Sequence, residues 1–398
     1  MSRKNSNILT INGGSSSLKF AMYEMAENPK LKFFGNINRI GLDNPAFTVT
    51  SHNNNKKKGF QIDASDFQKT VAFLIEWLEK QPGFDQVKCI GHRIVHGMNH
   101  TQAEIIDEYL LQELKRISEY SPDHLPVEIE IIRVFKKQCP GLLQVACFDT
   151  AFHATLPRIA KMLPIPRRFD QAGIQRYGFH GLSYAYLMEE LEKIAGADEA
   201  NGRIILAHLG NGASLTAVKE GKSIDTSMGF TPAGGFMMGT RCGDLDPGVA
   251  WFMMKSEGMK AKQFNHLINH EAGLLGVSEI SSDMQDLLQQ ESSDENAAEA
   301  VALFCYQVKK WIGAFTAVSG GLDTLVFSGG IGENAPVIRS RICENLHYAG
   351  IELDEEQNRK NATQISTVDS TVKVRVIPTN EELMIAKSTM RLYIESEN

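Results

Sequence analysis

Three short segments of this 398-residue chain place an ionisable side chain in a turn between apolar runs. CFDTAFH carries Asp149 where a predicted strand ends, RYGFHG carries His180, and TRCGDLDPG carries Arg241. A lone histidine or aspartate is more often structural than catalytic. The three together, beside several glycine loops, favour phosphoryl transfer, which needs mainly positioning, a divalent cation and positive groups around the phosphoryl oxygens.

GHRIVHG places Arg93 and Val95 on one face of a predicted strand. The opposite face carries His92 and His96. A zinc-binding helix would need glutamate where Arg93 stands, and Ile94 and Val95 favour a strand. A guanidinium beside an apolar side chain suits a small acid, with the fork on the carboxylate and the valine against a methyl group. A surface arginine on a half-buried strand is an equally good interpretation.

INGGSSSLKF, residues 11–20, is compatible with a phosphate cradle and with a plain β-turn. It is not a P-loop, because Leu18 precedes Lys19, Phe20 follows it, and a strand follows where a P-loop needs a helix. A glycine-rich hairpin can still direct backbone N–H groups and hydroxyls at an anion. Period-two alternation puts Ser17 and Lys19 on one face of the second strand.

LGNGAS repeats this strand, turn and strand pattern later in the chain. A shift of 197 residues takes Gly13 to Gly210 and Ser17 to Ser214. A duplicated domain explains the repeat, and a chain of this length is expected to form two or three domains.

Hydrophobic periodicity predicts alternating strands and helices, which indicates an α/β fold. Spacing near 3.6 predicts helices at 67–81, 108–120 and 297–321, and a last helix follows PTNEEL. SGGIGENAP is predicted as a glycine loop between the strand 324–328 and a helix capped by Asn334, and a nucleotide could approach its backbone. SHNNNKKKGF is predicted as a solvated hairpin tip.

The composition excludes several classes of protein. The formal net charge of −7 argues against nucleic acid or anionic membrane as a main partner. No apolar run approaches the ~20 residues of a membrane helix, and ILTI is too short for a signal sequence. The 6 cysteines form no C-x-x-C pair, which favours reduced thiols and a cytoplasmic protein.

Nine motifs in order resemble the acetokinase family, within the actin, hexokinase and Hsp70-like ATPase superfamily. They are INGGSSSLK, GHRIVHG, FDTAFH, RYGFHG, HLGNGAS, DTSMGFTP, MMGTRCGDLDP, GGIGEN and PTNEEL. The resemblance implies two duplicated actin-like ATPase (ribonuclease H-like) domains with a nucleotide cleft between them. We expect the N-terminal domain at 1–149 plus 381–398. The C-terminal domain, with most nucleotide contacts, is expected at 150–380.

The resemblance also implies roles at the matching positions. Asp149 resembles the essential acid, and His180 and Arg241 resemble the groups that steady the transferred phosphoryl. The acid substrate is expected to contact Arg93, Val95, Phe179 and Pro232. The expected nucleotide contacts are Lys19, Ser15, Ser17, His208, Leu209, Gly210, Asn211, Gly212, Asp283, Met284, Gln285, Gly330, Ile331, Gly332, Glu333 and Asn334. Asn12 and Glu381 resemble the pair associated with Mg²⁺, for which Mn²⁺ is expected to substitute.

The implied reaction is the reversible, magnesium-dependent transfer of the ATP γ-phosphoryl group to acetate, giving acetyl phosphate and ADP. A carboxylate acceptor, with a pKa of about 4, is already ionised at neutral pH. Asp149 is therefore expected to orient other groups or to act through water or metal rather than to accept a proton. A kinase that prefers propionate or butyrate and a non-catalytic ATP-switched protein of the same superfamily are the alternatives. The resemblance also implies a homodimer.

Five positions depart from the usual residues of the family. Asp123 and Leu125 stand where leucine and asparagine are usual near the acid substrate, which bears on substrate preference. Leu182 and Tyr184 replace the usual threonine and histidine beside the catalytic histidine. Gln285 replaces an arginine, so the expected adenosine contact there loses its charge.

Overall fold

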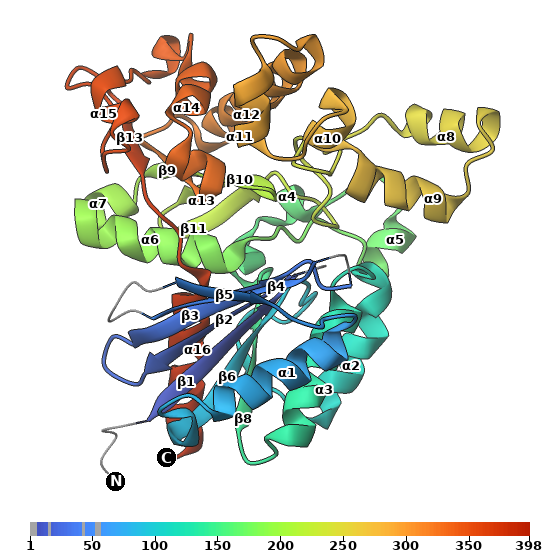
Figure 1. Ribbon diagram of the computed structural model, residues 1–398. Coiled ribbons are helices and arrows are strands. Elements are labelled where there is room, and N and C mark those ends of the chain that lie inside the picture. Colours follow the sequence, from blue (N-terminus) through green and yellow to red (C-terminus); the bar gives the residue numbers. More distant parts are fainter. Residues whose placement is uncertain (1–5, 15–16, 42–43, 52–56) are drawn as a thin grey trace. The chain divides into compact units, whose positions relative to one another are not determined.

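The computed structural model describes residues 6–14, 17–41, 44–51 and 57–398 and divides into two compact units (Figure 1). Unit 1 comprises Met1–Ala151 and Asn380–Asn398, and unit 2 comprises Phe152–Thr379. Thr150, Ala151 and Asn380, which the predicted boundaries assign to the C-terminal domain, belong to unit 1.

Unit 1 contains a mixed sheet with helices on both faces. Its strands are β1 (Asn7–Gly13), β2 (Ser17–Glu24), β3 (Lys30–Asn38), β4 (Ala46–Ser51), β5 (Lys57–Gln61), β6 (Val87–Ile94), β7 (Glu104–Ile105) and β8 (Leu143–Phe148). Its α-helices are α1 (Phe67–Glu79), α2 (Glu108–Arg116), α3 (Leu125–Gln138) and α16 (Glu381–Ser396), with 3₁₀ turns at Phe84–Gln86 and Ile117–Tyr120.

Unit 2 contains a second sheet and more helices. Its strands are β9 (Arg203–Leu209), β10 (Ala213–Lys219), β11 (Lys222–Thr226), β12 (Thr324–Ser328) and β13 (Lys373–Val376). Its longer α-helices are α6 (Gly181–Ala195), α8 (Pro247–Ser256), α12 (Glu295–Ser319) and α14 (Pro336–Cys343). Its shorter helices are α4 (Arg158–Lys161), α5 (Arg167–Gln171), α7 (Ala197–Ala200), α9 (Ala261–His266), α10 (Gly273–Ser278), α11 (Met284–Gln290), α13 (Gly329–Asn334) and α15 (Glu355–Arg359), with a π-helical turn at Leu267–Glu271 and 3₁₀ turns at Ala151–Thr155, which begins in unit 1, and His347–Ala349.

The two sheets share one central topology. Among the described residues, the order is β5-β4-β3-β2-β1-β6-β8-β7 in unit 1 and β11-β10-β9-β12-β13 in unit 2. The first three strands of each unit pair antiparallel, whereas β1–β6–β8 and β9–β12–β13 pair parallel. The predicted α/β class is confirmed, and the strand order common to both units agrees with the predicted duplication.

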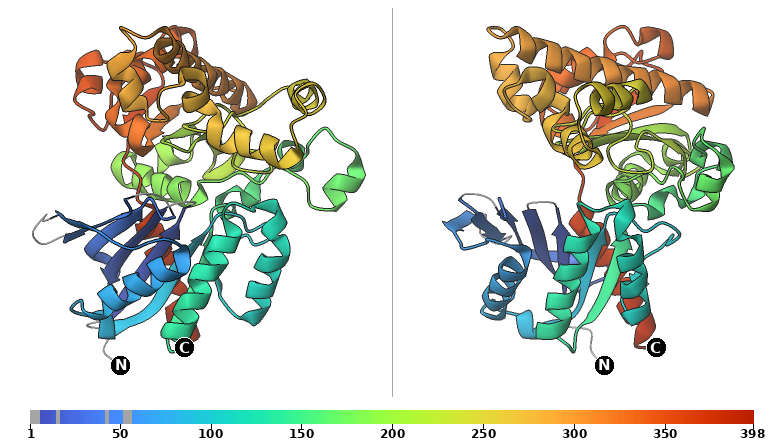
Figure 2. Two further views of the ribbon diagram at one scale, coloured as in Figure 1. Left: turned by 45° about the vertical axis from the view of Figure 1, so that its right-hand side comes forward. Right: turned by 90° about the vertical axis from the view of Figure 1, so that its right-hand side faces the viewer.

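The alternation predicted for the second strand sorts its side chains between two cores of unit 1. Leu18, Phe20 and Met22 pack with residues of α1 and α3. Ala21 and Tyr23 pack on the opposite face, against α16. Figure 2 shows the red α16 on one face of this sheet and α1 and α3 on the other. The ends of β1 and β2, which carry predicted site residues, are therefore fixed by helices on both sides.

The sheet of unit 2 is covered in the same way. Tyr184, Leu187 and Leu191 of α6 are buried against Ile204 and Leu206 of β9. The long α12, confirmed as a helix, contacts β9, β10 and β11. No helix among the described residues is long and apolar enough to cross a membrane.

Three local predictions need correction or fall outside the structure. The strand of GHRIVHG ends at Ile94, so Val95 and His96 do not lie on it. GGIGEN forms the helix α13 rather than a loop, and Ala335, not Asn334, caps α14. Residues 52–56, half of the predicted hairpin tip, lie outside the described residues.

Candidate active site

A buried ion pair joins the ends of β6 and β8 in unit 1. Nη2 of Arg93 lies 2.5 Å from Oδ2 of Asp149, and Nε donates to the same oxygen at 3.1 Å. Nη1 of Arg93 donates to Oδ1 of Asn12 at 3.3 Å. The Arg93 side chain is 15% exposed and Asp149 is fully buried. Three predicted site residues are thus brought together in one unit.

The charges around Arg93 keep it protonated. Burial alone lowers the pKa of this guanidinium, but the negative charges of Asp149 and Glu381 outweigh it and raise the pKa above its ordinary value. Asp149 accepts two hydrogen bonds from Arg93. This geometry favours an orienting role for Asp149.

Val95, the predicted apolar neighbour of Arg93, is 2% exposed, and an acid that the sequence prediction missed lies beside it. The backbone nitrogen of Val95 donates to both carboxyl oxygens of Glu128, each at 3.2 Å. Glu128 is 3% exposed on α3. Burial raises the pKa of Glu128 to about 8. In the sequence, an acid in the first turn of a helix gives no sign of this burial.

The first hairpin and the last helix meet in unit 1. Nδ2 of Asn12 donates to Oε2 of Glu381 at 3.1 Å and to Oε1 of Glu382 at 3.5 Å. Two carboxylates beside an amide are oxygen donors of the kind that Mg²⁺ takes, because it usually binds one or two carboxylates together with water and substrate phosphates. The described residues contain no group of three or more His, Cys, Asp or Glu that could hold a metal.

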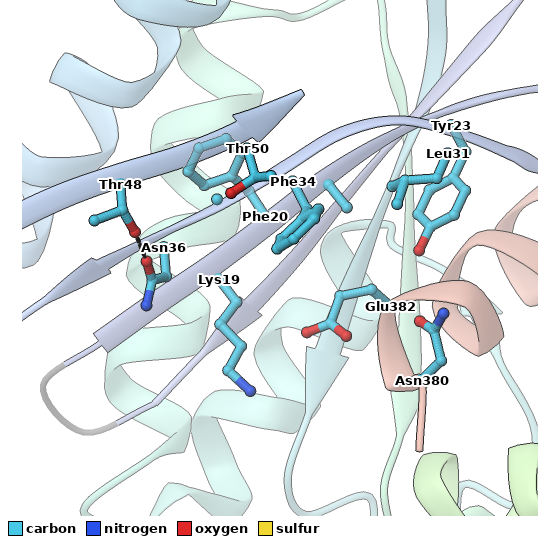
Figure 3. Close-up of a pocket in the computed structure, with 12 residues that line it drawn as sticks. Lys19, Phe20, Tyr23, Leu31, Phe34, Asn36, Thr48, Thr50, Asn380 and Glu382 are labelled. Atoms are coloured by element: carbon cyan, nitrogen blue, oxygen red, sulfur yellow. Dashed lines mark hydrogen bonds between the residues drawn. The ribbon is translucent and has the colours of Figure 1, made fainter. Parts of the chain in front are cut away.

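Lys19 and Glu382 line one pocket of about 580 Å³ in unit 1 (Figure 3). Its walls include Phe20 and Phe34. Ser17 is the first residue of β2, whereas the predicted contact Ser15 lies outside the described residues.

In unit 2, His180 is held by a chain of hydroxyl groups. It has φ 59° and directly precedes α6. Its Nδ1 is hydrogen-bonded to Oγ of Ser214 at 2.8 Å, and the hydroxyl of Tyr184 lies 2.5 Å from the same oxygen. The ring of His180 stacks on that of His208, with centroids 4.4 Å apart. Ser183 is hydrogen-bonded to His208 Nδ1 at 2.8 Å. Both predicted histidines are therefore fixed by neutral partners.

His180 and Arg241 converge on the turn between β9 and β10. A methyl group added to Gly212 would lie 3.4 Å from Nε2 of His180 and 3.6 Å from Nη1 of Arg241. Nη1 of Arg241 also donates to the backbone oxygen of Pro232 at 3.3 Å. An imidazole and a guanidinium beside a glycine turn are suited to bind phosphoryl oxygens.

Phe179 and Pro232, the other predicted walls for the acid, also belong to unit 2. Phe179 is 1% exposed, and its backbone oxygen is hydrogen-bonded to Nε2 of the buried His153 at 3.0 Å. Burial lowers the pKa of His153 to about 4, so this ring is neutral and donates to Phe179.

A pocket of about 820 Å³ lies in unit 2 beside the β9–β10 turn. Predicted nucleotide contacts that line it are Gly210, Asn211, Asp283, Met284, Gln285, Gly330, Ile331 and Asn334. The prediction missed the lining residues Ser282, Leu288, Ala335, Pro336 and Val337. The remaining predicted contacts of unit 2, His208, Leu209, Gly212, Gly332 and Glu333, are not among the residues that line it.

Two side chains fix α13 at the edge of this pocket. Oε1 of Glu333 accepts from the backbone nitrogens of Gly329 at 2.8 Å and Thr379 at 3.1 Å. Arg339, fully buried, donates to the backbone oxygens of Gly332 at 2.8 Å and Glu333 at 3.1 Å. These bonds explain why a glycine-rich segment is helical here.

Comparison with known proteins assigns the chain to a family. Residues 7–387 match the model of the acetokinase family. An acetate kinase of Halothermothrix orenii is 41% identical over 97% of this chain and 99% of that protein. A propionate kinase of Citrobacter rodentium is 42% identical over 97% of this chain and 96% of that protein. A solved structure of Porphyromonas gingivalis acetate kinase is 36% identical and has a TM-score of 0.87. The match covers 97% of this chain and 99% of that one.

The chain belongs to the acetokinase family. It is a short-chain carboxylate kinase, and the kinases of this family use ATP.

Proposed function

We propose that this protein transfers the γ-phosphoryl group of ATP to acetate, reversibly and with magnesium, giving acetyl phosphate and ADP. The observation that carries the proposal is the convergence of His180 and Arg241 on Gly212, whose neighbour Asn211 lines the large pocket of unit 2. Two donors at one glycine turn are suited to the equatorial oxygens of a phosphoryl group.

In this proposal unit 1 handles the acid. The fork of Arg93 pairs with the substrate carboxylate while Asp149 holds the guanidinium from behind, and Val95 contacts the methyl group. Acetate reaches the site already ionised, so the reaction needs no base. Asp149 is therefore a positioning group rather than a proton acceptor.

Unit 2 handles the nucleotide. We place ATP in the pocket of about 820 Å³, with Asn211 and Gly330 near its phosphates and Gln285 near the adenosine. Backbone N–H groups at glycine turns bind phosphate, and a neutral glutamine gives the adenosine a hydrogen bond without a charge.

We assign Mg²⁺, or Mn²⁺ in its place, to Glu381 and Glu382, with Asn12 orienting the Glu381 carboxylate. When bound, the ion neutralises phosphate charge. Lys19 and Ser17, on β2, complete the phosphate side of this proposed site.

Propionate is the second candidate for the acid substrate. The 42% identity to a propionate kinase matches the 41% identity to an acetate kinase, so both acids stay open on similarity alone. We choose acetate as the first candidate and keep propionate or butyrate preference as the alternative. We further propose a homodimer located in the cytoplasm, in line with the family resemblance and the six free cysteines.

The deciding experiment measures ATP turnover with formate, acetate, propionate and butyrate and traps the acyl phosphate with hydroxylamine. We expect the largest kcat/KM for acetate. A larger kcat/KM for propionate or butyrate would replace acetate as the substrate. If no acid gives a trapped acyl phosphate with folded protein, the proposed reaction is wrong and a non-catalytic ATP-switched protein becomes the better interpretation.

A further inference from the structure

Glu128 lies directly behind a wall of the proposed acid site. Both of its carboxyl oxygens are 3.2 Å from the backbone nitrogen of Val95, two residues from Arg93. The side chain comes from the first turn of α3 and is enclosed by the core of unit 1, with 3% exposure. Any change in the charge of this carboxyl therefore acts on the backbone that carries the proposed pocket.

Three carboxyl groups act electrostatically on the Arg93 guanidinium. They belong to Asp149, Glu381 and Glu128. If all three are ionised, the four groups together carry two negative charges; if Glu128 is protonated, they carry one. A substrate carboxylate meets less repulsion beside Arg93 in the second case, and burial strengthens the difference.

The surroundings of Glu128 favour its neutral form. Burial raises its pKa to about 8; Arg93 and the Val95 N–H act in the opposite direction, and Asp149 raises the pKa further. At pH 7 the carboxyl is therefore mostly protonated. One oxygen can still accept from Val95 in that state, so protonation removes the charge without removing the contact.

The other ionisable groups around α3 are neutral, paired or turned to solvent. His92 on β6 is hydrogen-bonded to Gln144, and burial lowers its pKa to about 4. The other charged residues of α3 and of the helices packed against it are exposed, except for Glu113 and Glu130, which are half-buried. The exposed ones are Lys69, Glu76, Glu79, Glu108, Lys115, Arg116, Arg133, Lys136 and Lys137. Asp123 and His124 are half-buried just before the helix. Arg93 and Asp149 are the charges that act on the Glu128 carboxyl.

We propose that Glu128 is a positioning residue that must carry a proton for the short-chain acid to bind beside Arg93, so that acid affinity is coupled to pH. The inference rests on the proposed function, because it needs Arg93 to receive a carboxylate. It adds that this kinase takes up its substrate as an anion together with a retained proton.

The coupling gives a defined pH profile. If only the protonated form binds acid, the KM for acetate rises about tenfold from pH 7 to pH 9, since the apparent constant scales with the protonated fraction of Glu128. The KM for ATP, whose proposed pocket is in unit 2, stays unchanged over the same range.

The test compares the wild type with Glu128→Gln and Glu130→Gln across pH 6.5 to 9.5. Glutamine keeps the size of Glu128 and can accept from Val95, but it carries no charge at any pH. Glu130→Gln removes a carboxyl from the same helix without touching Val95. We expect Glu128→Gln to abolish the alkaline rise in the KM for acetate and Glu130→Gln to retain it.

Calorimetry in buffers of different ionisation enthalpy gives a readout that does not depend on turnover. At pH 8 the wild type should take up about half a proton for each acetate bound, because half of the free protein is deprotonated at Glu128. Glu128→Gln should take up none. A structural role alone would leave proton uptake the same in both proteins.

The outcomes separate this inference from the proposed function. If both wild type and Glu128→Gln form acyl phosphate and show the same alkaline rise in the KM for acetate, the role of Glu128 is overturned. The kinase assignment then stays intact. If no acid gives acyl phosphate in any of the folded proteins, the proposed function fails and the inference fails with it. The proposal is supported if the KM for acetate of Glu128→Gln does not change with pH and this variant takes up no proton on binding acetate.

Discussion

Tyr184 and His180 are joined through a single hydroxyl group: Oγ of Ser214 lies 2.5 Å from the tyrosine oxygen and 2.8 Å from Nδ1 of the histidine. Tyr184 and Ser214 are fully buried, and His180 is 8% exposed. The chain of hydrogen bonds leaves Nε2 of His180 directed at Gly212. Tyr184, noted in the sequence as a departure from the family, is therefore the residue that supports His180 from behind.

Replacing Tyr184 with phenylalanine should lower kcat about fivefold, because one hydrogen bond contributes about 1 kcal/mol and 1.4 kcal/mol is a factor of ten in rate. The KM for acetate should change little, since the acid is assigned to unit 1. Tyr186→Phe, a half-buried tyrosine on the same helix, is the matched control. Equal kcat values for Tyr184→Phe and the control would show that the support of His180 is not needed.

Arg241→Ala should reduce turnover by about 10² or more, because a fixed donor at the developing charge of the transition state is removed. Arg241→Lys keeps a positive charge but loses the planar guanidinium, so its turnover should lie between those of the wild type and Arg241→Ala. The measurement is the steady-state rate at saturating ATP and acetate. Near-normal turnover in Arg241→Ala would remove this residue from the proposed phosphoryl site.

Asp149→Asn should lower the free energy of unfolding by about 3 kcal/mol, because the largely buried Arg93 guanidinium loses the carboxylate to which it is hydrogen-bonded. The Arg203–Asp323 pair is the matched control, since its side chains are 36% and 43% exposed. Asp323→Asn should therefore change the unfolding free energy by less than about 1 kcal/mol. Urea denaturation of both variants makes the comparison, and equal losses would argue against a special burial of the Arg93–Asp149 pair.

Two buried histidines should make the protein sensitive to acid. Burial lowers the pKa of His92 and of His153 from 6.5 to about 4. Their stabilising contribution is present above pH 6.5 and is lost as the pH falls from 6.5 towards 4, since the unfolded chain then binds more protons. Each contributes a slope of about 1.4 kcal/mol per pH unit in that window.

The experiment measures the free energy of unfolding of wild type and His153→Gln between pH 4 and 8. Glutamine can still donate to the backbone of Phe179, but it does not titrate, so the acid slope should fall by about 1.4 kcal/mol per pH unit. His347→Gln, at an exposed histidine, is the control. An acid slope that is the same in all three proteins would contradict the assignment.

The sequence predicted the local elements well where one periodicity dominates. Leu18, Phe20 and Met22 alternate with Lys19, Ala21 and Tyr23, and this period predicted the strand. Only the structure shows that Ala21 and Tyr23 are buried on its opposite face as well. The helical GGIGEN segment could not be predicted, because its glycines favour a loop. Its helix depends on Glu333 and on Arg339, whose bonds form only in the folded chain.

The site was predictable in its members rather than in its geometry. The motifs pointed to His180 and Arg241, but their meeting at Gly212 depends on contacts between residues far apart in the chain. Glu128 was missed for a related reason. Its place in a first helical turn is normal for an exposed acid, and only the packing of α3 in unit 1 encloses it.

Arg339 has an electrostatic consequence for the pocket that its helix borders. All five of its hydrogen bonds in the described structure end on carbonyl or amide oxygens, contributed by Gly332, Glu333, Asn358 and Asn361. Burial lowers the pKa of Arg339 to about 10, so it still carries its full charge at neutral pH. Dissolved salt screens a buried charge poorly. Unit 2 therefore keeps a fixed positive charge beside α13 that high ionic strength does little to weaken.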